Sequence, residues 1–161
     1  MQNCSFTGHR AIPSNEVAAL TRALAYKMIA LYGEGCRNFY SGGAIGFDLL
    51  AATMVLRMRK KYPDVRLHMV LPHKGQERYF SDADAALYRE VLAAADSIEY
   101  VSEHYFDGVM KKRNERLVAL CDACICYVTR FRSGAAQTMR MAERAGKPLY
   151  NLAKELGYTD F

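Results

Sequence analysis

The order of apolar segments along the chain limits the possible folds more than any other feature. Short apolar runs alternate with longer segments in which apolar residues recur every three or four positions. Strands separated by helices are typical of βαβ units and a parallel sheet. We therefore predict an α/β fold, namely a single Rossmann-like domain over residues 1–161 with a mainly parallel sheet and helices on both faces.

The pattern predicts six strands and five helices. Ser81 is the expected N-cap of the third helix, because its hydroxyl can accept a hydrogen bond from the first turn. The segment between residues 72 and 80 is predicted to be a long polar loop. The predicted strands are 4–7, 38–40, 65–71, 98–101, 123–128 and 149–152, and the predicted helices are 17–31, 49–62, 81–95, 110–121 and 133–145.

Composition excludes several classes of protein. With 51% hydrophobic and 24% charged residues, the chain is typical of globular proteins. No apolar run approaches the roughly 18 residues that span a bilayer, so no membrane partner is expected. The first residues contain no basic region followed by a long apolar stretch, which is the pattern of a signal peptide. We expect a cytoplasmic protein.

Charge and cysteine content constrain partners and cofactors. The formal net charge of +5 favours anionic partners but does not separate a nucleotide from a nucleic acid. Five cysteines, an odd number, suit a reducing compartment. Cys121 and Cys124 have the C-x-x-C spacing of metal and redox sites, yet Cys124 to Val128 also has the pattern of a buried strand. No second ligand pair completes a zinc site, so we predict no metal.

Small polar and basic residues follow three of the predicted strands. The three turns are 8–10 (Gly-His-Arg), 41–43 (Ser-Gly-Gly) and 133–135 (Ser-Gly-Ala). In parallel sheets of this kind, ligands bind beyond the carboxyl ends of the strands. His9 and Arg10 are therefore candidates for phosphate contacts or for acid and base groups.

The turn from Ser41 to Gly46 is the sharpest candidate for a phosphate site. Glycine permits close approach of the backbone to a phosphate, and the start of the following helix adds free N–H groups and a favourable dipole. The same sequence is compatible with a tight strand-to-helix turn that binds nothing. Asp48, in the first turn of that helix, can accept a hydrogen bond from a ribose hydroxyl or from the loop backbone, or can simply complement the helix dipole.

Arg113 and Asn114 fall on the apolar stripe of their predicted helix. A guanidinium that faces the interior must be paired, either with a structural carboxylate or with a ligand phosphate. The segment after the third strand, which includes Gln76, offers cations for phosphate and aromatic rings for a base, and it can equally be a solvated loop.

Taken in order, these segments resemble the SLOG superfamily, and most closely its YpsA-like branch. The resemblance rests on residues 7–10 (Thr-Gly-His-Arg), 41–48 (Ser-Gly-Gly-Ala-Ile-Gly-Phe-Asp), 113–114 (Arg-Asn) and 133–138 (Ser-Gly-Ala-Ala-Gln-Thr). The superfamily also includes the DNA-processing protein DprA and the LOG phosphoribohydrolases. The resemblance implies a Rossmann-like fold that binds a nucleotide or a nucleotide derivative, and a homodimer.

The resemblance and the residue patterns together define a set of candidates. We expect a bound nucleotide-type ligand and no other firmly indicated cofactor, and we leave the catalytic residues unassigned. The predicted ligand-binding residues are Gly8, His9, Arg10, Ser41, Gly42, Gly43, Gly46, Asp48, Gln76, Arg113, Asn114, Ser133, Gly134 and Thr138.

Two departures bear on catalysis and binding. LOG enzymes carry a carboxylate where this chain has Met141, and hydrolysis of an N-glycosidic bond needs an acid near the ribose. Ala135 stands where YpsA-like loops usually have glycine. A non-catalytic nucleotide binder is therefore the first hypothesis. The alternatives are a phosphoribohydrolase in which Asp48 or Glu143 replaces the acid, and a DprA-like binder of single-stranded nucleic acid.

Overall fold

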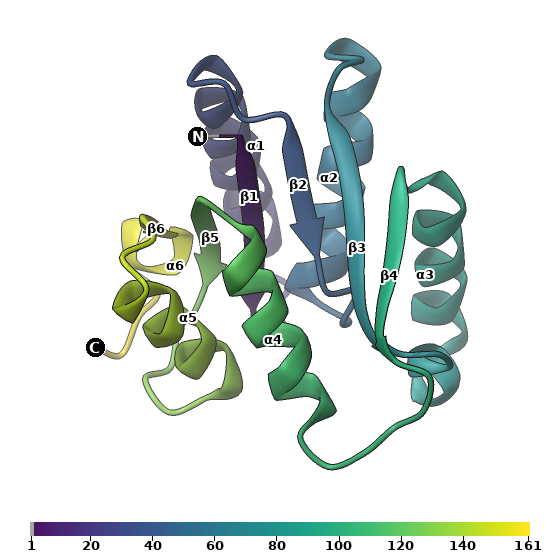
Figure 1. The fold of residues 1–161 in the computed structure, drawn as a ribbon. Coiled ribbons are helices and arrows are strands. Elements are labelled where there is room, and N and C mark those ends of the chain that lie inside the picture. The colour runs from purple at the N-terminus through teal and green to yellow at the C-terminus, as the bar shows by residue number, and fades with distance from the viewer. Residues whose placement is uncertain (1) are drawn as a thin grey trace.

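The computed structural model describes residues 2–161, which form one six-stranded sheet flanked by helices (Figure 1). The strands are β1 (Asn3–Gly8), β2 (Asn38–Ser41), β3 (Arg66–His73), β4 (Ser97–Ser102), β5 (Ala123–Tyr127) and β6 (Leu149–Asn151). The helices are α1 (Val17–Gly33), α2 (Phe47–Lys61), η1 (Gln76–Tyr79), α3 (Asp82–Ala94), α4 (Val109–Leu120), α5 (Gly134–Arg144) and α6 (Leu152–Glu155).

All strand pairs in the sheet are parallel, and the strand order is β4-β3-β2-β1-β5-β6. The chain builds outward from β1 to β4 and then crosses back to place β5 on the other side of β1. The strand order therefore reverses between β1 and β5. This arrangement confirms the predicted Rossmann-like fold.

Helices cover both faces of the sheet, as Figure 1 shows. Helices α4 and α5 pack together on one face, and α1 and α2 lie on the other. The larger core cluster, between the sheet and α1 and α2, includes Phe6, Phe39 and Phe47, all essentially inaccessible to solvent. Strand β5 is buried along its whole length, because both of its faces are covered.

The predicted elements are confirmed, with two differences at their ends. The segment predicted as a long loop contains the end of β3 and the short helix η1. Residue 152, predicted to end the last strand, instead begins the four-residue helix α6. Both missed helices have four residues, too few to show a helical apolar period.

Local signals at helix ends act as expected. The Ser81 hydroxyl accepts a hydrogen bond from the Asp84 amide at 3.2 Å, so Ser81 caps α3.

All five cysteines are free and buried, and Cys124 and Cys126 pack against α4 and α5. No helix in the part of the chain that the structure describes is long and apolar enough to cross a membrane.

Candidate functional site

The turn that follows β2 is held together by Ser41 and Asp48. The Ser41 hydroxyl donates to the Asp48 carbonyl oxygen at 2.9 Å and accepts from the Gly43 amide at 3.3 Å. The Asp48 carboxylate accepts from the Ala44 amide at 3.3 Å. Of the alternatives for Asp48, the structure therefore places its carboxylate on the loop backbone.

Arg113 reaches this turn from α4 on the opposite face of the sheet. Its side chain is 4% exposed, and its guanidinium donates to the Gly42 carbonyl oxygen through Nη1 and to the Asn114 side-chain oxygen through Nε at 2.9 Å. The buried Gln76 amide also lies 3.5 Å from the same Gly42 oxygen. Two donors from distant segments thus fix the orientation of the Gly42 peptide.

The charges of Arg113 and Asp48 stabilise each other across the turn. Burial raises the pKa of Asp48, and the nearby Arg113 charge opposes this rise. Burial lowers the pKa of Arg113, and Asp48 opposes that change. Among residues 2–161, none of the four ion pairs shorter than 4.0 Å includes either group. The two charges therefore attract each other across the turn without forming a close ion pair.

The glycines in the turn make room for the protein's own atoms. A Cβ at position 42 would lie 2.6 Å from Arg113 Nη1 and 2.9 Å from Asp48 Oδ2. Gly46 has a φ of +79°, and a Cβ there would lie 2.3 Å from the Arg10 carbonyl oxygen. Close packing within the chain therefore accounts for both glycines without a ligand.

His9 joins the ends of β1 and β5, where the strand order reverses. Its Nε2 accepts a hydrogen bond from the Thr129 amide at 2.8 Å, which places the proton of the neutral ring on Nδ1. Burial lowers the pKa of His9, and the Arg130 charge adds to this effect. Gly8, which precedes His9, packs closely against the Phe47 ring.

The start of α5 lies after β5 and is self-contained. The Ser133 hydroxyl accepts from the Ala136 amide at 3.0 Å, so Ser133 is the N-cap. Thr138 is buried and donates to the Gly134 carbonyl oxygen at 3.2 Å. Gly134 faces open space, since no atom lies within 4 Å of a Cβ built there.

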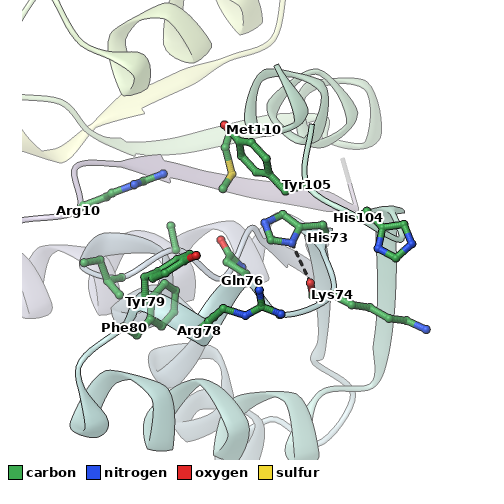
Figure 2. A pocket seen from close by; sticks show the side chains of 13 residues that line it. Arg10, His73, Lys74, Gln76, Arg78, Tyr79, Phe80, His104, Tyr105 and Met110 are labelled. Atoms are coloured by element: carbon green, nitrogen blue, oxygen red, sulfur yellow. Dashed lines mark hydrogen bonds between the residues drawn. The ribbon is translucent and has the colours of Figure 1, made fainter. Parts of the chain in front are cut away.

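A pocket of about 540 Å³ opens beside the turn, beyond the carboxyl ends of β3 and β4 (Figure 2). Ala44 and Ile45 of the turn line it, together with the segments after β1, β3 and β4. None of its thirteen lining residues is acidic. Five of them are arginine, lysine or histidine: Arg10, Lys74, Arg78, His73 and His104.

Aromatic side chains enter the pocket from two segments. Tyr79 comes from the segment after β3 and is 90% exposed, and Tyr105 comes from the segment after β4 and is 62% exposed. Figure 2 shows them on different sides of the pocket, with Tyr105 beside His73. The His73 and Tyr105 rings meet edge to face with centroids 5.7 Å apart.

The predicted site residues separate into five groups. Arg10 and Gln76 line the pocket directly. Five more lie in or under the turn that forms its wall: Ser41, Gly42, Gly43, Gly46 and Asp48. Arg113 and Asn114 support that turn from α4. Gly8 and His9 lie at the β1 end, and Ser133, Gly134 and Thr138 do not line this pocket.

Sequence reasoning missed the wall formed by His104, Tyr105 and Met110. These residues follow β4, so their place at the carboxyl edge of the sheet was the available signal. Without the strand order, nothing indicated that the segments after β3 and β4 share one pocket.

Comparison with known proteins decides the family. The YpsA family model, described as the YspA SLOG family, matches residues 8–152. This chain belongs to the YpsA SLOG family. The match includes the turn after β2, the Arg113 position and the start of α5.

Curated relatives of this YpsA-family chain are UPF0398 proteins. The protein from Halalkalibacterium halodurans is 26% identical over 111 residues, which cover 68% of this chain and 59% of the relative. The one from Bacillus licheniformis is 24% identical over 143 residues, which cover 84% of this chain and 78% of the relative.

Solved structures of DNA processing protein A share the fold. The Helicobacter pylori protein, in a study of its single-stranded DNA binding mode, matches with a TM-score of 0.64 and 20% identity over 99% of this chain and 74% of that chain. The Streptococcus pneumoniae protein matches with a TM-score of 0.65 and 19% identity, over 92% of this chain and 49% of that chain.

Proposed function

We propose that this YpsA-family protein binds a nucleotide or a nucleotide-derived ligand in the pocket beyond β3 and β4. One observation carries the proposal: a pocket of mononucleotide dimensions is lined by two arginines, a lysine and two exposed tyrosines, with no carboxylate among its lining residues. Cations hold phosphate, and exposed aromatic rings stack on bases.

The pocket divides the ligand contacts between two kinds of residue. Arg10, Lys74 and Arg78 are exposed and free to move toward an anion, although Lys74 also lies 3.3 Å from Glu103. Arg113 and Asp48 act indirectly, because they hold the turn that forms the wall.

The first test is thermal unfolding against AMP, ADP, ATP, NAD, ADP-ribose and cyclic nucleotides. A ligand at about 100 times its Kd stabilises the folded state by roughly 2.7 kcal/mol, which raises the Tm by several degrees. We expect Arg78→Gln and Tyr79→Ala to lower this shift without changing the Tm of the free protein, since both side chains are exposed.

Two exposed residues outside the pocket provide matched controls. Arg57 lies on α2 and Tyr26 lies on α1, and neither lines the pocket. Arg57→Gln and Tyr26→Ala should therefore keep the full shift. If no nucleotide raises the Tm, or if the control variants lose the shift as much as the pocket variants do, the proposal is wrong.

A second candidate function is binding of single-stranded nucleic acid. The observation that favours it is a further exposed ring, Phe131, which lies between Arg130 and Arg132 in the segment after β5. With Tyr79 and Tyr105, it extends the aromatic and basic residues along the carboxyl edge of the sheet. Surfaces of this kind stack successive bases on their aromatic rings, and their affinity for nucleic acid falls steeply as the salt concentration rises.

Phe131 distinguishes the two candidates, because it does not line the pocket. If the protein binds an oligonucleotide, Phe131→Ala should weaken binding to a dT oligonucleotide at low salt. If it binds only a mononucleotide, Phe131→Ala should leave the nucleotide-induced Tm shift unchanged.

A further inference from the structure

The pocket beyond β3 and β4 is lined by basic side chains and by no acidic residue. The acidic residues nearest to the lining in sequence are Glu77, Glu103 and Asp107, and none of them lines the pocket. Glu103 lies 3.3 Å from Lys74 on the exposed side, and Asp107 accepts from the Tyr105 hydroxyl at 3.4 Å. Asp48 lies under the turn, where its carboxylate accepts from the Ala44 amide.

This distribution of charge bears on the ionic form of the ligand. Nucleotide sites that take a magnesium complex usually supply one or two carboxylates to the metal, together with the phosphates. Here Lys74 is paired with Glu103, and the guanidiniums of Arg10 and Arg78, which form no ion pair within 4.0 Å among residues 2–161, are the cations available to the phosphates. A magnesium ion on the phosphate would face these cations and would meet no lining carboxylate, so like charges would repel.

We infer that the pocket takes its ligand as a metal-free nucleoside phosphate with two phosphate groups, and that Mg²⁺ competes with the protein for it. The inference rests on the proposed function and adds the class and ionic form of the ligand. The volume of about 540 Å³ fits one nucleoside with its phosphates. The two guanidiniums of Arg10 and Arg78 can each bind one phosphate group.

Titration calorimetry with ADP tests the inference, first with EDTA and then with Mg²⁺ in excess, at matched ionic strength. If only free ADP binds, the apparent Kd rises by the inverse of the free fraction, so about tenfold when nine-tenths of the ADP is complexed. AMP, whose single phosphate binds Mg²⁺ more weakly, is the matched ligand and should change much less.

The outcomes separate this inference from the proposed function. Binding of ADP in EDTA that weakens in Mg²⁺ supports both. Binding that is unchanged or tighter in Mg²⁺ overturns the metal-free form and leaves nucleotide binding standing. Failure of ADP and AMP to bind in either buffer overturns the proposed function and, with it, the inference.

A charge reversal gives an independent check. Arg78→Glu places a carboxylate on an exposed lining position, where it can help to hold a metal. We expect this variant to bind ADP weakly in EDTA and to bind it more tightly when Mg²⁺ is added, the reverse of the wild type. Arg57→Glu, outside the pocket, should behave as the wild type. If Mg²⁺ weakens ADP binding to Arg78→Glu as much as to the wild type, the counterion role of Arg78 is wrong.

Discussion

The Arg113 guanidinium lies inside the protein, where the Gly42 carbonyl, the Asn114 side chain and the nearby Asp48 carboxylate stabilise its charge. Removing it would leave the Gly42 oxygen with a single long contact to Gln76 and the buried Asp48 without its compensating charge. The role of Arg113 that the structure supports is to position the turn.

We expect Arg113→Ala to lower the free energy of unfolding by on the order of 3 kcal/mol, because a buried charge loses its partner. Urea denaturation measures the change. Arg116→Ala, on the same helix, removes only an exposed ion pair with Glu99 and should cost less than about 1 kcal/mol. Equal small losses in both variants would contradict the positioning role.

We expect an alanine substitution to have opposite effects on stability at Gly46 and at Gly134, although both residues stand at the start of a helix. At Gly46, a left-handed φ and the Arg10 carbonyl 2.3 Å from the added Cβ should make Gly46→Ala destabilising by more than about 1 kcal/mol. Gly134→Ala enters open space in a helical position and should be neutral or stabilising by up to about 1 kcal/mol. Thermal unfolding of the two variants checks this contrast, which disappears if the turn can move to admit a side chain.

At the scale of elements, His9 connects β1 to β5 by accepting from the Thr129 amide, a bond that only the neutral ring can make. Since burial lowers its pKa below the unfolded value of 6.5, the unfolded chain takes up the proton first as the pH falls. The stability that His9 contributes is therefore complete above pH 6.5 and is lost as the pH falls through 6.5 toward the lower folded-state pKa.

We expect the free energy of unfolding to fall between pH 7.5 and pH 5.5, and to fall less in His9→Gln, whose side chain does not titrate. Denaturation at a series of pH values measures both slopes. The pKa of His68 is also lowered by burial, but His68 is present in both proteins, so the difference between slopes reports His9. Identical slopes would show that His9 protonation does not oppose folding.

The elements themselves could be predicted because each carries a long apolar period or a capping residue. The four-turn stripe of α1 and the Ser81 cap of α3 are local signals that depend on nothing distant. The helices η1 and α6 were not predicted, because four residues are too few to show the apolar period of a helix. The contact of Arg113 with Gly42, seventy-one residues apart, depends on a crossover that local patterns do not encode.

At the scale of the whole molecule, the pocket exists because the strand order brings the segments after β1, β2, β3 and β4 to one edge of the sheet. The sequence indicated this edge, the lining residue Arg10 and the segment 72–80, which includes Gln76. It could not indicate that the start of α5 lies outside the pocket lining, because that separation follows from the reversal of strand order between β1 and β5.

The positions of the two candidate acids, Asp48 and Glu143, indicate whether the protein can hydrolyse a bound nucleotide. Release of a base from a nucleotide needs an acid near the ribose, yet Asp48 is 6% exposed beneath the turn and Glu143 lines a different hollow beside β6. We therefore expect that a nucleotide which raises the Tm will be recovered intact after prolonged incubation with the protein, as measured by chromatography of the free base. Base release that Asp48→Asn abolishes, in a variant that still binds the nucleotide, would assign catalysis to Asp48 and contradict a role limited to the loop backbone.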